Sequence, residues 1–581
     1  MDKIRIGHEA GDKRQGSYAI AIGHDAGEYH QESNAIAIGH DAGKHHQENN
    51  SVAMGYNAAK YEQENSSVAI GHNSAKEYQG DSSVSIGHNA GKDTQGNSSV
   101  SIGHNTGHNL QGRTSIAMGY EAGYERQGNN SNQIVPVGNS IAIGNQAGYY
   151  LQSSSSIAMG YQAGYTGQNF SSTSIGNQAG YNDQGIGAIS IGTQAGFTGQ
   201  DNQAIAIGTQ AGYTGQHDSS IAIGNHAGYE GQGDNYGDED DSAFAIAIGN
   251  SAGRTKQGTR SVAIGYETGF FEQHIDAVAI GTHAGYTGQN NNAIAIGQNA
   301  GSTEQQTSAI AIGQDSGQNQ QNSYALAIGQ HAGQNQQNIN TVAIGTSAGY
   351  IGQNINAIAI GQNAGYTGQQ TSAISIGKNA GRNQQQTSAI AIGLQAGNSQ
   401  QNNNAIAIGQ NAGYTEQQTS AISIGINAGL NQQNSYALAI GQDAGNFQQN
   451  NSAIAIGRNA GNARQKANAI AIGLDAGKTD QVENSIAIGK NAGATGSVQN
   501  GIAIGNGSVS TNGAIVIGAN GGLAGSGANL YVKTISSGTI SGSVEYSGTG
   551  VRVTINNILQ YNPNTGLITY GTFQETGGVF I

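Results

Sequence analysis

Histidine recurs at one position of a repeated motif in the N-terminal part of the chain. Directly after the glycine of an Ile-x-Ile-Gly motif stand His8, His24, His40, His72, His88 and His104, and Tyr56 and Tyr120 take this position in two further copies. Imidazoles stacked one copy apart could bind a metal ion or change charge near neutral pH. His8, His24 and His40 are therefore candidate metal ligands. Later copies carry Asn177 or even Leu394 there, and such tolerance favours a solvated column without metal.

A second set of possible metal ligands lies in an acidic segment between two motif copies. It contains Asp234, Asn235, Asp238, Glu239, Asp240 and Asp241. Ca²⁺ prefers oxygen ligands, so Asp238 and Asp240 are candidates. Their spacing matches neither a calcium-binding helix-loop-helix nor the nonapeptide calcium solenoids. We expect a solvated acidic loop, no bound metal and no cofactor.

Aromatic residues form another column, five positions after the motif glycine. Successive copies carry Tyr149, Tyr165, Tyr181, Phe197, Tyr213 and Tyr229. Stacked rings stabilise a ladder by themselves, and aromatics exposed along one stripe commonly mark a contact surface. A structural ladder is the favoured interpretation. The alternative is a binding strip for a sugar or for another fibre.

No arrangement in the sequence predicts catalysis. A glycan-cleaving site needs two carboxylates held a fixed distance apart, whereas Asp and Glu are scattered over variable positions here. The glycines belong to the repeat and form neither a phosphate-binding loop nor a nucleophile elbow. We predict that the protein is not an enzyme and has no catalytic residue.

These columns exist because the chain repeats itself. The glycine of the Ala-Ile-Ala-Ile-Gly motif, as at Ala35 to Gly39, returns every sixteen residues and gives 31 copies between positions 7 and 505. Two intervals, 119 to 144 and 224 to 249, are 25 residues long, so each contains a nine-residue insertion that keeps the register. These insertions, near 129–137 and 233–241, are expected to be surface loops of a solenoid.

Each motif copy predicts one coil of a parallel β-solenoid. β-Branched residues alternate with Ala or Ser before the glycine, which is the periodicity of a strand. Two glycines per coil are too costly for a helix interior but suit tight corners. Coils stacked about 4.8 Å apart would extend on the order of 150 Å. The fold class predicted is all-β, a rod built of many thin coils.

The residue between the two β-branched positions is almost always small, as at Ala37, Ala69, Ser85, Ser101, Ser375 and Ser423. A face kept that small usually lies against another backbone. We therefore expect the β-branched residues to face the coil interior and the Ala column to face a neighbouring copy of the chain. The alternative is a monomeric coil whose cross-section needs small residues on two sides.

Glutamine stands eight positions after the motif glycine in 29 consecutive coils, among them Gln15, Gln31, Gln47, Gln257, Gln401 and Gln481. Amides stacked at the strand spacing can hydrogen-bond along the axis, as in the ladders of cross-β structures. A catalytic residue would occur once, whereas this one occurs in every coil. Its predicted role is structural.

Composition limits the classes of protein and of partner. Only 36% of the 581 residues are hydrophobic and 10% are charged, so a thin core repeated many times suits the chain better than one thick core. A net charge of -14 argues against nucleic-acid binding. The chain has no cysteine. Repeats begin too early for a signal peptide, and no stretch is apolar enough for membrane insertion.

The motif resembles a known family of repeats. The Ser-Ile-Ala-Ile-Gly-x-x-Ala core at Ser140 to Ala147 and at Ser485 to Ala492 is similar to the head repeats of trimeric autotransporter adhesins. The resemblance covers roughly residues 1–505. It implies a left-handed parallel β-roll, a homotrimer and a role in attachment. The sixteen-residue period with its fixed Gln is longer than the usual adhesin repeat, and we expect neither the secretion signal nor the membrane barrel of those proteins.

Similar repeats occur in fibres of tailed phages, phage-like injection devices and large DNA viruses, which need neither feature. After Gly489 the Gln column ends, and residues 529 to 581 alternate like short strands with a hairpin at Leu559 to Tyr570. The stretch from Tyr561 to Tyr570 resembles segments near the C-terminal ends of phage and giant-virus fibre proteins. We therefore expect two domains, a solenoid over 1–505 and a β-rich tip or trimerisation region over 506–581.

These observations together predict a structural fibre or spike on the surface of a virion or phage-like particle, outside the cell. Its expected partners are copies of itself in a homotrimer, other particle components, and a glycan or receptor on a host surface. One alternative is a bacterial trimeric adhesin at the cell surface. Another is a self-assembling filament or coat protein without a receptor.

Overall fold

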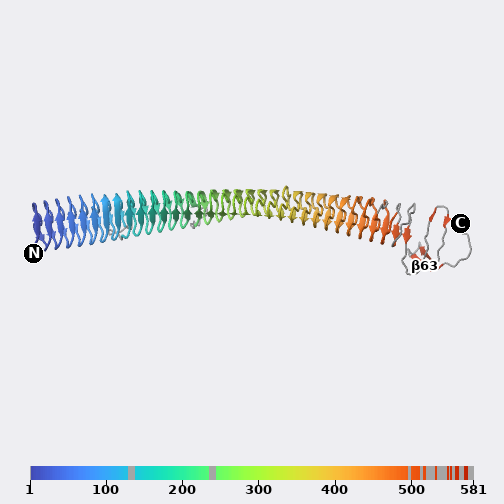
Figure 1. Ribbon diagram of the computed structural model, residues 1–581, viewed down its shortest axis with the longest axis horizontal. Helices are drawn as coiled ribbons and strands as arrows, with labels where there is room; N and C mark the ends of the chain where they lie inside the picture. Colours follow the sequence, from blue (N-terminus) through green and yellow to red (C-terminus); the bar gives the residue numbers. More distant parts are fainter. Residues whose placement is uncertain are drawn as a thin grey trace. The chain divides into compact units, whose positions relative to one another are not determined.

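The structure is a computed structural model that describes residues 2–128, 138–234, 244–494, 499–510, 515–518, 530–532, 546–547, 550–551, 557–561 and 568–572. It divides into two compact units, Met1–Gly352 and Gln353–Ile581. Figure 1 shows short strands that follow one another coil by coil in each unit. The described residues form an all-β parallel solenoid of about thirty coils and contain no helix, which confirms the predicted solenoid.

The strands of the first face cover the three residues before each motif glycine. In the first unit they begin with β1 (Ile4–Ile6) and β3 (Ile20–Ile22) and reach β41 (Val342–Ile344). Two of them are longer, β13 (Val100–His104) and β15 (Ile116–Tyr120). Neighbouring strands pair in parallel with a shift of sixteen residues, so that Ile4 lies beside Ile20.

The strands of the second face end at the repeated glutamine. In the first unit they begin with β2 (Lys13–Gln15) and β4 (Tyr29–Gln31). The two-residue strands are β8 (Glu62–Gln63), β10 (Tyr78–Gln79) and β12 (Thr94–Gln95), and the longer ones are β28 (Glu230–Asp234) and β30 (Thr255–Gly258). Each coil therefore contributes one strand to each face.

The second unit repeats this arrangement. Its first face contains β43 (Ile358–Ile360), β44 (Ile374–Ile376) and their successors to β58 (Ile515–Ile517), followed by β59 (Leu530–Val532). Its second face runs from β45 (Asn383–Gln385) to β53 (Phe447–Gln449). Two antiparallel pairs follow, β60 (Tyr546–Ser547) with β61 (Gly550–Val551), and β62 (Asn557–Tyr561) with β63 (Ile568–Thr572). The last pair places Leu559 opposite Tyr570, at the position of the expected hairpin.

Both insertions leave the ladder in register. Ile116 pairs with Ile141 across the first, and Ile221 pairs with Ile246 across the second. The first insertion, 129–137, and residues 235–241 of the second lie outside the described residues. The structure therefore confirms the register and does not describe the loops themselves.

The motif glycines stack directly on one another from coil to coil. Gly313 has a φ of +124°, and a Cβ on it would lie 2.7 Å from the carbonyl oxygen of Gly329. A side chain is excluded both by the backbone conformation and by the backbone of the next coil. This corner is the reason why glycine is retained at the end of every motif.

The side chains of the first face point opposite to the direction expected from the sequence. Ala206 is completely buried, whereas its neighbour Ile207 is 36% exposed. Where Ser replaces Ala, its hydroxyl reaches the interior, as when Ser190 Oγ donates a hydrogen bond to Gln200 Oε1 at 2.5 Å. The prediction that Ile faces the coil interior and Ala faces another chain is wrong.

The narrow interior explains this reversal. Each coil encloses a few small residues and one glutamine, as in the cluster of Ala26, Ala37, Ala42 and Ala53. A Cβ added to Gly43 would meet the Gln47 side chain within 3 Å, so no space remains for a branched side chain. The narrow cross-section of the coil itself therefore requires the small Ala column, in agreement with the alternative that the cross-section needs small residues.

Candidate functional site

The glutamines form a hydrogen-bonded ladder through most of the described coils, interrupted where Gln111 Oε1 accepts from Ser101 and where Gln152 Oε1 has no donor. Gln305 is fully buried, and its Nε2 donates to Gln321 Oε1 at 3.0 Å and to the carbonyl oxygens of Ile294 and Ala309. Its Oε1 accepts from Gln289 at 3.1 Å. The same side-chain bonds link the other glutamines singled out in the sequence, namely Gln15 to Gln31, Gln31 to Gln47, Gln257 to Gln273, Gln401 to Gln417 and Gln465 to Gln481. Each of these amides ties one coil to the next, and in the coil of Gln305 the amide also ties one face to the other.

The first coil departs from this pattern at one residue. Arg5 stands where later coils have the interior Ala, and its Nε donates to Gln15 Oε1 at 2.6 Å. Lys3 Nζ donates to the backbone oxygen of the same glutamine. These two cations satisfy the first acceptors of the ladder. The sequence signal was an Arg in the small-residue column, which sequence reasoning did not use.

The six aromatic residues predicted as a column lie in one stack. Ring centroids of Tyr149 and Tyr165 are 5.0 Å apart with an interplanar angle of 10°, and the stack continues through Tyr181, Phe197, Tyr213 and Tyr229. His108 and Tyr124 extend it at its beginning. The ring faces cover one another, so the stack offers ring edges and hydroxyls to solvent. Partial burial raises the pKa of Tyr149 and of Tyr165.

The histidine column is stacked in the same way. The rings of His24 and His40 have centroids 4.8 Å apart and are parallel within 4°. His8 stacks on His24 at 4.8 Å, and His72, His88 and His104 form a second run. The side chains of His8 and His24 are 65% and 51% exposed. The other metal candidates, Asp238 and Asp240, lie outside the described residues.

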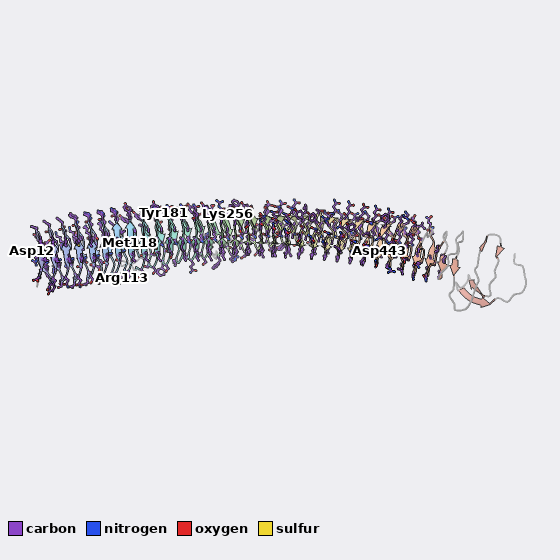
Figure 2. The ribbon with its side chains drawn as sticks, in the orientation of Figure 1. Asp12, Arg113, Met118, Tyr181, Lys256 and Asp443 are labelled. Atoms are coloured by element: carbon purple, nitrogen blue, oxygen red, sulfur yellow. The ribbon has the colours of Figure 1, made fainter. Side chains whose placement is uncertain are left out.

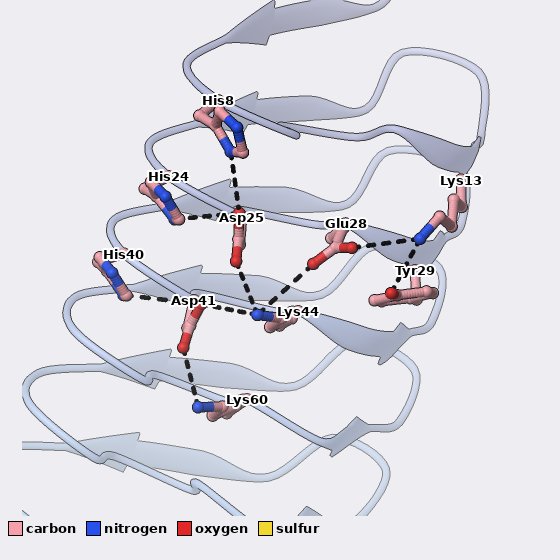
Figure 3. Close-up of polar contacts among 10 residues, drawn as sticks. All are labelled: His8, Lys13, His24, Asp25, Glu28, Tyr29, His40, Asp41, Lys44 and Lys60. Carbon is pink, nitrogen blue, oxygen red and sulfur yellow. Dashed lines mark hydrogen bonds and ion pairs between the residues drawn. The ribbon is translucent and has the colours of Figure 1, made fainter.

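A charged cluster joins the first four coils beside the histidines (Figure 3). Lys44 Nζ lies 2.7 Å from Asp25 Oδ2, 3.1 Å from Asp41 Oδ1 and 3.5 Å from Glu28 Oε2. Lys60 contacts Asp41 at 2.8 Å, and Lys13 contacts Glu28 at 3.4 Å. We call these six residues the N-terminal charge cluster.

The charges of this cluster hold one another in the ionised form. Burial alone would raise the pKa of Asp25 and of Asp41, but hydrogen bonds and charge from Lys44 and Lys60 outweigh it and leave both pKa values below their ordinary range. Burial likewise opposes the charge of Lys44, and its carboxylate partners raise its pKa well above the ordinary value. Sequence reasoning missed the cluster, although its signal was present: Lys occupies one fixed repeat position in four successive early coils, at Lys44, Lys60, Lys76 and Lys92.

The outward face of the first sheet is aliphatic. The two residues flanking the buried Ala are Ile, Val, Leu or Met in every copy of the motif except for Thr173. Met118, labelled in Figure 2, and Ile207 belong to this face and are 38% and 36% exposed. Monomeric proteins rarely expose contiguous apolar patches larger than a few hundred Å², and larger patches mark interaction sites. This face is free of charge and continues along many coils of each unit. We call it the aliphatic face.

Comparison with family models, curated proteins and solved structures found no match for the chain. In the part of the chain that the structure describes, no helix is long and apolar enough to cross a membrane. The surfaces that remain as functional candidates are the aliphatic face, the aromatic stack and the N-terminal charge cluster with its histidines.

Proposed function

We propose that the chain forms the body of a structural fibre or spike on a virion or phage-like particle. In this proposal three copies of a left-handed solenoid pack through their aliphatic faces, and the assembled fibre mediates attachment to a host surface. The region after residue 505 serves as a tip or trimerisation region. The observation that carries the proposal is the aliphatic face itself, because uncharged Ile side chains that are exposed to water are stabilised when another surface buries them.

Another copy of the chain suits this face better than an unrelated partner does. The aliphatic side chains recur once per coil, at the spacing of the paired strands, about 4.8 Å. A second solenoid with the same rise presents matching side chains along its whole length, whereas a globular partner would match only a few coils. Repeated self-complementarity of this kind is typical of closed homo-oligomers.

The interior supports a mechanical role. Within each unit, backbone ladders on two faces and a glutamine ladder between them connect most described coils to their neighbours. Such nearest-neighbour contacts stabilise a long solenoid without a thick core. This regular interior fits adhesion and mechanical support.

Labelling of particles tests the proposal. Antibodies raised against the purified chain should bind intact particles released by the source organism, with gold label on projections from the particle surface in electron micrographs. Label confined to the cell envelope would instead support the bacterial adhesin. Label restricted to the cell interior would contradict both proposals.

A further inference from the structure

Coils 1 and 2, residues 4–19 and 20–35, bring two imidazoles and one carboxylate to the same point (Figure 3). Asp25 Oδ1 lies 3.0 Å from His24 Nδ1 and 3.6 Å from His8 Nδ1. These three atoms all lie within 4.8 Å of one another. Two nitrogen ligands and one oxygen ligand therefore converge from adjacent coils.

The carboxylate oxygen at this point is buried and lacks a hydrogen bond of normal geometry. Asp25 is only 9% exposed, and its Oδ1 has no hydrogen-bond donor among the described residues. Its other oxygen is held by Lys44 at 2.7 Å. A buried acceptor without a well-aligned donor is costly, and this Oδ1 lies beside the two imidazoles.

The next coil contains the same residue types, but its carboxylate is already engaged by lysines. His24, His40 and Asp41 also come together there. Both oxygens of Asp41, however, are already engaged, Oδ1 by Lys44 at 3.1 Å and Oδ2 by Lys60 at 2.8 Å. The first constellation is therefore open to an additional cation, and the second is filled by lysine.

Later coils keep the histidines but lose the carboxylate. Asn73, Asn89 and Asn105 follow His72, His88 and His104, and these amides hydrogen-bond to one another along the column. The combination of stacked imidazoles with an unused carboxylate oxygen thus belongs to the first coils alone among the described ones. A residue set that departs from the repeat at one place is more characteristic of a site than of the architecture.

The distances suit a four-coordinate transition metal. Bonds of 2.0–2.2 Å to nitrogen and oxygen in tetrahedral geometry place ligand atoms roughly 3.4 Å apart, and the observed separations of 3.0 and 3.6 Å lie on either side of that value. The histidine side chains are more than half exposed, so small ring rotations can bring the two nitrogen atoms to the metal. Lys44 would hold the carboxylate in place from behind, as outer partners of metal ligands do.

We propose that His8, His24 and Asp25 form a binding site for a divalent transition-metal ion such as Zn²⁺, with water in the remaining position. Imidazole and carboxylate ligands favour Zn²⁺, Ni²⁺ or Cu²⁺ over Ca²⁺ and Mg²⁺. The ion bridges coil 1 and coil 2 and so stabilises the first coil against local opening, because a ligand that binds only the folded state shifts the equilibrium toward it.

Zinc titration of the whole chain tests this site. We expect one Zn²⁺ per chain to bind more tightly than the weak background of other surface histidines, measured by equilibrium dialysis against a competing chelator. Asp25→Asn should weaken this tight binding by about tenfold or more, since even an outer partner of a ligand commonly contributes 10–100-fold. His8→Gln should do the same while leaving the ion pair of Asp25 with Lys44 intact.

His88→Ala is the matched control, because it removes an exposed ring from the same column beside Asn89. It should leave the tight binding unchanged. Circular dichroism of each variant shows whether the fold is retained, and Co²⁺ in place of Zn²⁺ should give the intense visible absorption of a tetrahedral site in the wild type only. Equal zinc affinity in the wild type, Asp25→Asn and His8→Gln would overturn the proposal, as would equal losses in His88→Ala.

Discussion

Glutamine is the large side chain that recurs fully buried in the described coils, and in most of them its amide both donates and accepts hydrogen bonds. In the coil of Gln305, one Nε2 serves three oxygens and one Oε1 serves the neighbouring glutamine. Buried polar groups are tolerated when every donor and acceptor is paired, and such networks specify a unique arrangement. This residue therefore determines which coil stacks on which, as well as how the two faces of a coil are joined.

Gln305→Ala should destabilise its coil by roughly 3 kcal/mol, because a cavity forms and the amide of Gln289 loses its acceptor. The loss should be visible as faster hydrogen exchange of the backbone amides near 297–312 and as a lower Tm. Gln298→Ala, at an exposed position of the same coil, is the control and should change neither. Equal effects of the two substitutions would show that the ladder contributes nothing to stability.

At the scale of the strand and its corner, the space around a position decides which residue types it can hold. The motif glycine lies against the glycine of the next coil, whereas β24 (Thr198–Gln200) has a left-handed residue with free space around it directly before its glutamine. Gly199 there has a φ of +66°, and a Cβ on it would have no neighbour closer than 3.9 Å. Although both glycines have a positive φ, a side chain is therefore excluded by a neighbouring backbone only at the motif glycine.

Gly313→Ala should cost at least about 2 kcal/mol and broaden the thermal transition, because the residue is forced into a glycine-only conformation against another backbone. Gly199→Asn should be tolerated, since other coils place residues such as Gln320 at the same left-handed position. Thermal denaturation followed by circular dichroism compares the two. A Gly199→Asn variant that loses as much stability as Gly313→Ala would contradict this account of the corners.

The N-terminal charge cluster predicts a pH dependence confined to the first coils. The pKa values of Asp25, Glu28 and Asp41 lie below their ordinary values of 3.8, 4.5 and 3.8, since lysine and tyrosine partners outweigh the opposing effect of burial. A carboxyl group with a lowered pKa in the fold stabilises it above the unfolded pKa, and this contribution is lost as pH falls through the folded value. The first coils should therefore loosen below about pH 4.

Pepsin digestion at about pH 4 and about pH 2, with the fragments identified by mass spectrometry, measures this loosening. Cleavage within residues 2–60 should increase at the lower pH relative to cleavage within 360–450, a region with few charges. A Lys44→Met variant should cleave readily at both values, because its carboxylates have lost their common partner. Unchanged protection of residues 2–60 at the lower pH would contradict the role given to these ion pairs.

The sequence alone predicted the repeat, the parallel solenoid and its register, because the motif glycine recurs every sixteen residues. Alternation in a strand defines two faces but not which of them is inside, and that depends on the width of the coil. The interior is narrow enough that Ala206 fits and Ile207 does not, a fact that no local pattern contains. Lys44 contacts Asp25, which lies 19 positions earlier in the chain and across a corner of the coil. This contact could not be predicted from the sequence without the geometry of that corner.

At the scale of the whole molecule, the outward aliphatic face is the feature that a single chain leaves unexplained. Most described coils pair their backbone and glutamine hydrogen-bonding groups within the chain itself. A strip of uncharged Ile and Val side chains, in contrast, gains stability only when it is covered. The proposed assembly of copies through this face accounts for the retention of aliphatic residues at positions that face solvent in one chain.

Charged substitutions on the aliphatic face should separate assembly from folding. Ile207→Lys combined with Ile223→Lys, in adjacent coils, should weaken association while leaving the β-sheet circular dichroism of the chain intact. Thr209→Lys combined with Asn225→Lys places the same charges two residues away, on an exposed corner where Lys378 occurs naturally, and should leave association unchanged. Equal association of both double variants would show that this face is not the interface.

The absolute mass of the purified chain in solution, by sedimentation equilibrium or light scattering, tests the central claim most directly. We predict about three chain masses, unchanged on dilution, because the aliphatic faces are covered in a closed assembly. A single chain mass of 59.1 kDa that persists at high concentration would contradict the trimer and the fibre built from it. It would leave a solenoid that keeps its Ile columns in water.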